Sequence, residues 1–328
     1  MRILSCGKYL PERRLTNEHL AGINLFDYDI EGNRLSEEPR ALNAKDIFRR
    51  TGILERRVAR SDESVADMGF QAAKKALLNA QIESEKLSGV YCATISGDRT
   101  PSVASQIAAR LGCKRVWAED VNAACAGFPR VLEVAYREDD LQGKYYLVVA
   151  SERLYDLVGG DDVNRILFGD AAGAVVVGPD NHFKDKRITG DILNFDKWGI
   201  QEGNPLIGID ETGYLRMPDG RKVFDYAVSE MTLMAEELGS YMGIQSDAVI
   251  KVIPHQANGR IVSGIARRLG SKYDVFNNIK QIGNVGAASS VIALRDAWNS
   301  GFIDRGDFVA LTTLGAGLNV SGVLLQFN

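Results

Sequence analysis

Three residues of this 328-residue chain combine reactive or hydrogen-bonding side chains with positions at the ends of predicted strands: Cys125, His255 and Asn284. Cys125 lies in D-V-N-A-A-C-A-G-F-P, between a predicted strand and a predicted helix. Because a helix N-terminus offers unpaired amides and a positive dipole end, we expect the pKa of this thiol to fall and the thiolate to act as a nucleophile. Small neighbours leave room for a substrate. The other interpretation is a buried structural cysteine, the commoner fate of this residue type.

The histidine in P-H-Q-A-N and the asparagine in G-N-V-G-A-A-S both lie in the second half of the chain. Of the three histidines, only His255 directly follows an apolar strand, whereas His19 and His182 lie in polar surroundings. Taken alone, His255 is interpreted as a core or loop residue, and Asn284 as a turn residue or helix cap. The catalytic interpretation is favoured by their combination with Cys125 at equivalent places of a doubled fold.

The composition excludes several classes of protein. Hydrophobic residues make up 45% of the chain and charged residues 25%, as in ordinary globular proteins. The net charge of -4 argues against general nucleic-acid binding, and no apolar run approaches the roughly 20 residues of a membrane span. The first residues predict a strand rather than a signal peptide. The four cysteines lack metal-site spacing and nothing suggests export, so we expect reduced thiols in a cytoplasmic protein. We also expect no metal and no cofactor.

Strand and helix patterns alternate along the chain. Apolar runs predict buried strands at Val90–Ile95 and Tyr145–Ser151, and helical spacing predicts helices at Ser64–Ala80 and Arg260–Leu269. The polar stretch Asp27–Lys45, which contains Gly and Pro, predicts an exposed excursion. Alternating strands and helices indicate an α/β protein.

Two segments of the first half have counterparts in the second. N-A-A-C-A-G-F-P-R-V-L-E resembles G-N-V-G-A-A-S-S-V-I-A-L, and F-G-D-A-A-G-A-V-V-V-G resembles L-G-A-G-L-N-V-S-G-V-L-L. Such a repeat at about half the chain length predicts two like domains that face each other, with a site at their junction. We place them at residues 1–180, which carry the nucleophilic cysteine, and 181–328, which carry the histidine and asparagine.

Six motifs in register identify a family that the chain resembles. They are R-T-G-I-x-E-R, N-A-A-C-A-G-F, F-G-D-x-A-G-A, P-H-Q-A-N-x-R-I, G-N-x-x-A-A-S and the final G-x-G loop. Together, from Arg2 to Phe327, they resemble β-ketoacyl-acyl-carrier-protein synthase III, the initiating condensing enzyme of the thiolase superfamily. The resemblance implies a thiolase-like α/β fold, in which two similar βαβαβαββ halves form an αβαβα five-layer sandwich. It also implies a homodimer and a catalytic triad of Cys125, His255 and Asn284.

The chemistry implied by this resemblance suits these residue types. A cysteine thiolate attacks an acyl thioester and holds the acyl group. A malonyl thioester then loses CO2, and neutral His255 and the amide of Asn284 can both donate hydrogen bonds to the developing oxyanion. The resulting carbanion attacks the acyl-cysteine. The family places a second oxyanion hole at the backbone amide of Cys125 and a glycine of the last loop, where Gly317 is the matching position; a plain turn glycine is the other interpretation.

The resemblance also implies a path for the acyl carrier. Arg50, Arg260 and Asn258 would flank or line a tunnel for the pantetheine arm, so the substrates would be thioesters of acyl-carrier protein or coenzyme A. Arg267 and Arg268 match a basic pair on an exposed helix, which suits an acidic carrier protein. A solvated arginine pair is the other interpretation of these two residues.

Three positions depart from the family pattern. Many members stack the adenine of coenzyme A between a tryptophan and an arginine, but the aligned residues here are Asp46 and Asp156, which cannot form a cation–π stack. The aromatic residue that often closes the primer pocket is replaced by Thr100. The Asp27–Lys45 excursion is also longer than usual. These departures question acetyl-coenzyme A priming and point to specialised metabolism or an unusual primer.

The first hypothesis is therefore a decarboxylative condensing enzyme of fatty-acid initiation or specialised metabolite biosynthesis. The second is an acyltransferase on the same scaffold, which would pass the acyl group from Cys125 to an alcohol or amine. Asn284 favours condensation, because simple transfer has no enolate to stabilise. A silent partner subunit of a heteromeric synthase is a third hypothesis, which the complete triad argues against. A thiolase proper would need a second catalytic cysteine late in the chain, and no cysteine follows Cys125.

Overall fold

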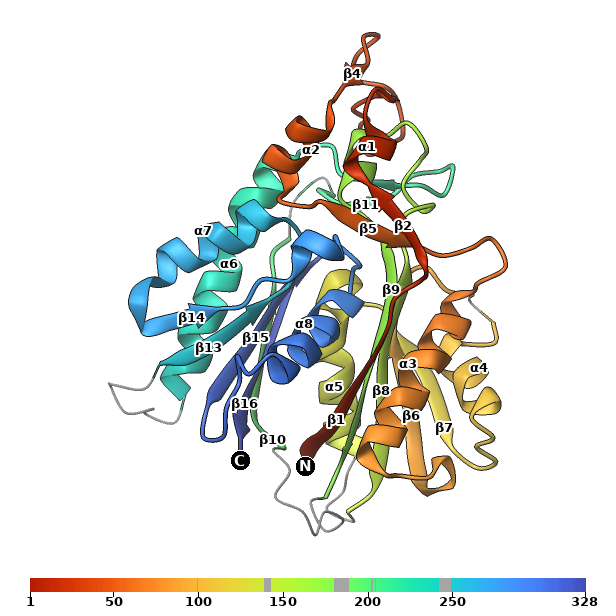
Figure 1. Cartoon of the computed structure of the whole chain (residues 1–328), viewed down its shortest axis with the longest axis vertical. Helices are drawn as coiled ribbons and strands as arrows, with labels where there is room; N and C mark the ends of the chain where they lie inside the picture. The colour runs from red at the N-terminus through yellow and green to blue at the C-terminus, as the bar shows by residue number, and fades with distance from the viewer. Residues whose placement is uncertain (99, 139–142, 180–188, 202, 204, 242–248) are drawn as a thin grey trace.

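A ten-stranded mixed sheet runs through this computed structural model, which describes all residues except 99, 139–142, 180–188, 202, 204 and 242–248 (Figure 1). The strand order is β14-β13-β15-β16-β10-β1-β9-β8-β6-β7. The strands of the first half are β1 (Arg2–Tyr9), β6 (Leu87–Ala93), β7 (Trp117–Val121), β8 (Tyr145–Arg153) and β9 (Asp170–Gly178). Those of the second half are β10 (Gly190–Gly199), β13 (Ile250–Pro254), β14 (Tyr273–Val275), β15 (Phe308–Gly315) and β16 (Asn319–Phe327).

The two halves of this sheet repeat one pattern of pairing. In the first half β6 is parallel to β7 and β8, whereas β9 is antiparallel to β8 and β1. In the second half β13 is parallel to β14 and β15, whereas β16 is antiparallel to β15 and β10. The halves join through the antiparallel pair β1–β10. The internal repeat predicted from the sequence is therefore confirmed in the topology. The predicted domain boundary between residues 180 and 181 lies outside the described residues and stays a prediction.

Helices cover both outer faces of the sheet and fill the space between its halves. Helices α3 and α4 pack on the first half, and α6 and α7 on the second. Helices α5 and α8 lie between the halves and share a core with strands of both (Figure 1). These layers form the αβαβα sandwich. The helices are α1 (Asn17–Leu20), α2 (Ala44–Thr51), α3 (Val65–Ala80), α4 (Val103–Arg110), α5 (Gly127–Glu138), α6 (Gly220–Ser240), α7 (Gly259–Leu269) and α8 (Ala288–Asn299).

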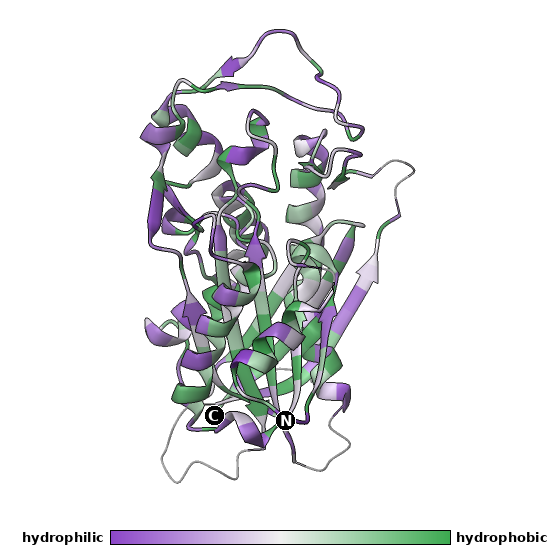
Figure 2. Ribbon diagram, turned by 90° about the vertical axis from the view of Figure 1, so that its right-hand side faces the viewer, coloured by the Kyte–Doolittle hydropathy of each residue, from purple (hydrophilic) through white to green (hydrophobic). Residues whose placement is uncertain are grey.

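The sequence explains why α8 is the central helix. Residues from Ala288 to Leu294 are buried without interruption, so the helix has no solvent-facing stripe in its first two turns. A helix that is apolar or small on all sides is stable only when it is enclosed, as here between two sheets. Figure 2 shows that hydrophobic segments are concentrated in the strands and in the helices that pack on them. The outer helices instead alternate buried and exposed positions, as predicted for Ser64–Ala80, where Ser64 is the N-cap.

A smaller layer of short elements lies at one end of the molecule, opposite both termini (Figure 1). It contains the strand pairs β2–β5 (Arg13–Thr16 and Glu55–Val58), β3–β4 (Asn24–Leu25 and Arg40–Ala41) and β11–β12 (Gly208–Ile209 and Leu215–Arg216). The prediction of an exposed excursion at 27–45 is largely confirmed. Most of its residues are exposed, but Tyr28 and Leu42 are buried, because the excursion folds back onto the body of the protein.

Candidate active site

Cys125 lies in a tight turn between β7 and α5, as predicted. The turn is the short helix η2 (Ala124–Ala126), and Ala124 adopts the left-handed conformation with φ of 47°. A non-glycine residue in this region is uncommon and marks backbone held in place by its surroundings. Gly315 supplies part of that support: a Cβ added to it would lie 2.7 Å from the amide nitrogen of Ala126 and 3.0 Å from that of Cys125. Glycine therefore lets the end of β15 approach the cysteine turn.

His255 follows β13 and is enclosed by protein. Its backbone amide donates a 2.7 Å hydrogen bond to the carbonyl of Thr312 on β15, and the residue is 2% exposed. Its buried Nδ1 has no hydrogen-bond partner among the described residues. Burial lowers the pKa of His255 to about 4, so its imidazole is neutral at physiological pH. A neutral imidazole can still donate one hydrogen bond, through whichever nitrogen carries the proton.

Asn284 is held by hydrogen bonds on its backbone and on one side-chain atom. Its amide nitrogen donates to the carbonyl of Leu167, and its carbonyl accepts from the amide of Gly169, both at 2.9 Å. Its Oδ1 accepts a 3.0 Å hydrogen bond from the backbone amide of Gly286. These contacts connect the loop before α8 with the loop before β9, so residues from both halves of the chain set the position of this side chain.

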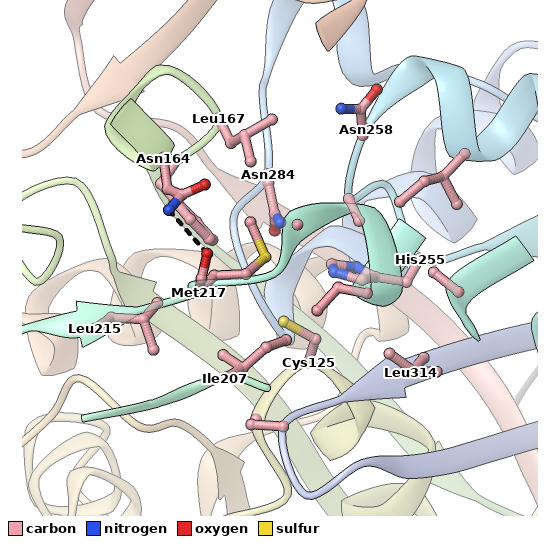
Figure 3. Close-up of a pocket in the computed structure, with 18 of the residues that line it drawn as sticks. Cys125, Asn164, Leu167, Ile207, Leu215, Met217, His255, Asn258, Asn284 and Leu314 are labelled. Atoms are coloured by element: carbon pink, nitrogen blue, oxygen red, sulfur yellow. Dashed lines mark hydrogen bonds between the residues drawn. The ribbon is translucent and has the colours of Figure 1, made fainter. Parts of the chain in front are cut away.

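The three predicted catalytic residues line one cavity of about 120 Å³ between the two halves of the chain (Figure 3). The structure therefore brings together residues that are up to 159 positions apart, and the predicted junction site is confirmed as a cavity. The rest of its lining is mainly apolar. It includes Ile95, Leu154, Leu167, Phe168, Ile207, Leu215, Met217, Val223, Phe224, Ala227, Met231, Ile261 and Leu314.

The predicted lowering of the Cys125 pKa is wrong. Burial raises the pKa of this thiol to about 12, and the carboxylate of Glu152 adds to the rise, whereas a hydrogen bond from the Cys125 backbone opposes it. Enclosure by apolar groups removes the solvation that a thiolate needs, and here this cost exceeds the benefit of the helix N-terminus. The resting nucleophile is thus a thiol whose proton must leave when it reacts.

Glu152 is a buried carboxylate that the sequence analysis missed. It is 0% exposed at the end of β8 and accepts hydrogen bonds from Thr94, Ile95 and Ser96. Burial raises its pKa to about 7, although these donors oppose the rise. The sequence did carry a signal, because Glu152 directly follows the apolar run Y-Y-L-V-V-A-S. A charged side chain at the end of a buried strand requires hydrogen-bond partners.

A second cavity, of about 770 Å³, adjoins the first and contains three residues predicted to guide the carrier. Arg50, Asn258 and Arg260 line it together. The Asn258 side chain donates a 3.2 Å hydrogen bond to the carbonyl of Arg50, and the Arg260 guanidinium carbon lies 5.8 Å from the centre of the Phe224 ring. The two cavities share Asn164, Leu167, Met217, Gly220, Phe224 and Asn258, so they form one path from the basic residues toward Cys125.

The residues predicted for the primer pocket and for the second oxyanion donor do not line the cavity that contains Cys125. Thr100 is exposed and is absent from its lining. Gly317 also lies outside the lining, whereas its neighbour Ala316 borders the cavity. The missed Ala316 had a sequence signal, because it is the middle residue of the G-A-G loop. The loop predicted to serve the oxyanion therefore borders the cavity through Ala316, and its oxyanion role stays a prediction.

The remaining predicted residues lie on the surface. Arg267 and Arg268 are exposed in the last turn of α7. Asp46 pairs with Arg49 at 2.9 Å. Asp156 pairs with Arg153 at 3.0 Å and with Arg165 at 3.6 Å. Neither aspartate lines the two cavities, and both carboxylates already have cationic partners.

The described part of the chain has no group of three or more His, Cys, Asp or Glu side chains arranged to hold a metal ion. His182 lies outside it. Within the same residues, no helix combines the length and the apolar composition that crossing a membrane requires.

Comparison with known proteins gives the family. The models for 3-oxoacyl-[acyl-carrier-protein] synthase III match residues 119–193, and those for its C-terminal part match residues 241–327. The β-ketoacyl-[acyl-carrier-protein] synthase III of Aquifex aeolicus is 37% identical over 335 residues, which cover 99% of both chains. The chain belongs to the 3-oxoacyl-[acyl-carrier-protein] synthase III family. The enzyme of the same name from Listeria welshimeri is 34% identical, with 99% of this chain and 98% of that protein covered.

Solved structures of a synthase III and of a priming β-ketosynthase share the fold. The crystal structure of the Aquifex aeolicus enzyme superposes with a TM-score of 0.85, 36% identity and 99% coverage of both chains. The priming β-ketosynthase of the R1128 polyketide pathway has a TM-score of 0.83 at 29% identity, with 99% of this chain and 96% of that chain covered. These likenesses confirm the predicted thiolase-like fold and the assignment to the synthase III family. The chain is accordingly an acyl-transferring enzyme of the condensing class.

Proposed function

We propose that this chain joins an acyl group on Cys125 to a malonyl thioester by decarboxylative Claisen condensation. The observation that carries the proposal is the convergence of Cys125, His255 and Asn284 on one largely apolar cavity. This cavity continues into a charged mouth that four arginines and three aspartates line. A covalent nucleophile, two neutral hydrogen-bond donors and an apolar space are what acyl transfer followed by enolate chemistry requires.

The first half-reaction transfers the acyl group to sulfur. The Cys125 sulfur bonds to the acyl carbon, the carbon–sulfur bond to the carrier breaks, and the cysteine proton ends on the departing carrier thiol. The pKa of about 12 means that sulfur attack and proton removal are coupled.

The second half-reaction forms the carbon–carbon bond. The malonyl thioester loses CO2, and the electrons of the broken bond become an enolate whose oxygen carries negative charge. His255 and Asn284 would donate hydrogen bonds to that oxygen. The enolate carbon then attacks the acyl carbon, and the Cys125 sulfur leaves as a thiolate that takes a proton from solvent water. The charge on the acyl oxygen during this attack would be met by the backbone amides of Cys125 and of the 315–317 loop, where Ala316 borders the cavity.

The carrier is proposed to be an acyl-carrier protein. Arg50 and Arg260 line the mouth, and Arg267 and Arg268 extend the positive charge along α7. Acidic carriers would be attracted to this side of the molecule, and exposed charges act mainly on the rate of encounter. The nucleotide end of coenzyme A would gain little, because Asp46 and Asp156 occupy the positions of the expected adenine contacts.

The wider setting follows the same proposal. The enzyme would act in fatty-acid and lipid biosynthesis or in the synthesis of a specialised metabolite, in the cytoplasm and without a cofactor other than its thioester substrates.

We further propose a homodimer. Strand β7 forms one edge of the sheet and exposes 66% of Trp117, and such an edge is suited to pairing with a second copy. In such a dimer, the exposed Thr100 just before α4 would reach a primer site only by crossing the interface between the two subunits.

The test uses the purified enzyme with a panel of acyl-carrier-protein thioesters. Intact-mass spectrometry should show one acyl group, which peptide mapping places on Cys125. Addition of malonyl-carrier protein should release CO2 and a 3-oxoacyl product, and Cys125→Ser should abolish both steps. Transfer of the acyl group to an added alcohol or amine without CO2 release would support the acyltransferase hypothesis instead. Failure of every thioester to acylate Cys125 would overturn the proposal.

A further inference from the structure

Arg216 is a buried cation in the wall of the catalytic cavity. It is 5% exposed and borders the cavity together with its neighbours Leu215 and Met217. Its Nη1 donates to Asp162 at 2.9 Å and its Nε donates to Asp210 at 2.7 Å. A buried guanidinium is stable only while its hydrogen-bond donors are matched by acceptors in fixed places. The position of this wall therefore depends on what holds Asp162 and Asp210.

The long excursion of the first half supplies that support from outside. The Tyr28 ring lies over the guanidinium of Arg216, with 4.1 Å from its centre to the guanidinium carbon. Gly32 lies against the other partner: a Cβ at this residue would come within 2.6 Å of the Oδ2 of Asp210. Gly32 also has φ of 92°, which side chains disfavour. The excursion thus contacts both the cation and one of its two carboxylates.

Backbone hydrogen bonds hold the excursion to the segment that carries Asp162. The amide of Phe26 donates to the carbonyl of Asp161 at 2.7 Å, and the amide of Val163 donates to the carbonyl of Phe26 at 2.8 Å. The Tyr28 hydroxyl donates to the carboxylate of Asp161 at 2.8 Å. Asp162 therefore lies between two residues that are hydrogen-bonded to Phe26, directly before the excursion, and Asp161 is also bonded to Tyr28 within it.

The same segments form adjoining parts of the cavity wall. Asn164 and Met217 both line the cavity, and the Asn164 side chain donates to the Met217 carbonyl at 3.3 Å (Figure 3). The amide of Leu215 donates to the carbonyl of Leu157 at 2.9 Å. Movement of Arg216 would therefore shift apolar residues that face the space next to Cys125.

We propose that residues 26–34 act as a clamp that keeps Arg216 between Asp162 and Asp210 and thereby sets the largest acyl primer that the cavity accepts. Tyr28 and Gly32 are positioning residues in this proposal, since neither lines the cavity. The inference rests on the proposed function, because it assigns the apolar part of the cavity to the acyl group. Protein interiors are closely packed, so a wall held at several points excludes a longer chain more strictly than a wall that can move.

The experiment measures the acylation of Cys125 by straight-chain acyl thioesters of 2 to 12 carbons, with kcat and KM for each length. The compared variants are wild type, Tyr28→Ala, Tyr28→Phe and Gly32→Ala. Glu37→Ala is the matched control, because Glu37 is an exposed residue of the same excursion, outside the residues of the clamp. Circular dichroism and thermal unfolding show which variants are folded.

The measured ratio is the kcat/KM for the shortest acyl chain that wild type rejects as too long, divided by the kcat/KM for the best wild-type primer. In Tyr28→Ala this ratio should be at least about tenfold higher than in wild type. Gly32→Ala should change the same ratio in the same direction, because Asp210 must move away from the new methyl group. Tyr28→Phe keeps the ring over Arg216 and the backbone hydrogen bonds of Phe26, and loses only the hydroxyl contact with Asp161. It should therefore stay close to the wild-type profile, and Glu37→Ala should retain that profile.

Unchanged chain-length profiles in folded Tyr28→Ala and Gly32→Ala would overturn the clamp. If Tyr28→Ala does not fold, Gly32→Ala decides alone. A uniform fall of kcat/KM at every length would also contradict the proposal, since it would show a general structural role rather than size selection. Absence of acylation in wild type would instead reject the proposed function, so the two failures are distinguishable.

Discussion

The Oδ1 of Asn284 accepts a 3.0 Å hydrogen bond from the backbone amide of Gly286, two residues further along the chain. This contact decides which end of the side-chain amide faces the cavity. With Oδ1 occupied by a donor, the NH2 group remains to serve the substrate, and among the described residues it has no other hydrogen-bond partner. Asn284 is therefore presented as a donor, which is the role that an enolate oxygen requires.

Replacement of either donor should separate the two half-reactions. We expect His255→Ala and Asn284→Ala to acylate Cys125 at close to the wild-type extent but to lose malonyl decarboxylation by about a hundred- to thousandfold, the effect of removing one oxyanion donor. Release of CO2 from malonyl-carrier protein, measured beside the acylation of Cys125, checks this. His19→Ala is the matched control, because His19 is exposed and lies outside the lining of the cavity. Wild-type condensation by both variants would contradict the assigned roles.

The raised pKa of Cys125 predicts how its reactivity depends on pH. With a thiol pKa of about 12, the thiolate fraction should rise about tenfold for each pH unit between pH 7 and pH 10. The rate of Cys125 alkylation by iodoacetamide, followed by peptide mapping, should increase over this range without a plateau. Cys125→Ser identifies any signal from the other cysteines. A rate that levels off below pH 8 would show instead that the helix N-terminus dominates over burial.

Burial of neutral His255 should make the protein sensitive to acid. The pKa is about 4 in the folded state and 6.5 in the reference state, so the unfolded chain binds an extra proton between these values. The free energy of unfolding therefore falls as pH drops from 6.5 to 4, by about 3 kcal/mol from this group, and does not change through it above pH 6.5. Urea unfolding at several pH values checks this. His255→Gln, which cannot titrate, should lose correspondingly less stability, and equal losses in both proteins would refute the assignment.

The basic surface of α7 predicts a salt-dependent preference for carrier protein. Wild type should have a higher kcat/KM for an acyl-carrier-protein thioester than for the same acyl group on coenzyme A, and this preference should weaken as salt rises. Arg267→Glu with Arg268→Glu should impair the carrier reaction and spare the coenzyme A reaction. Lys74→Glu with Lys86→Glu is the charge-matched control, because Lys74 on α3 and Lys86 just before β6 are both exposed and lie outside α7. A preference for coenzyme A at every salt concentration would exclude the proposed docking.

The sequence by itself determined the elements and the identity of the reactive residues. Helical and alternating periodicity is a local property, so the strand before Cys125, the α3 helix with its Ser64 cap and the repeated halves could be predicted from neighbouring residues. The six motifs then indicated the family, because their order along the chain is itself a feature of the sequence. The convergence of Cys125, His255 and Asn284 on one site was likewise predicted, through the repeat.

The tertiary structure alone decided the electrostatics and the walls of the site. The pKa of Cys125 depends on how many apolar groups from distant segments enclose the sulfur, and burial by them outweighs the local helix effect. The support of Arg216 by Tyr28 joins residues 188 positions apart, and Ala316 rather than Gly317 borders the cavity because of how β15 meets the cysteine turn. Contacts between segments far apart in the sequence leave no periodic signal, so only the folded chain shows them.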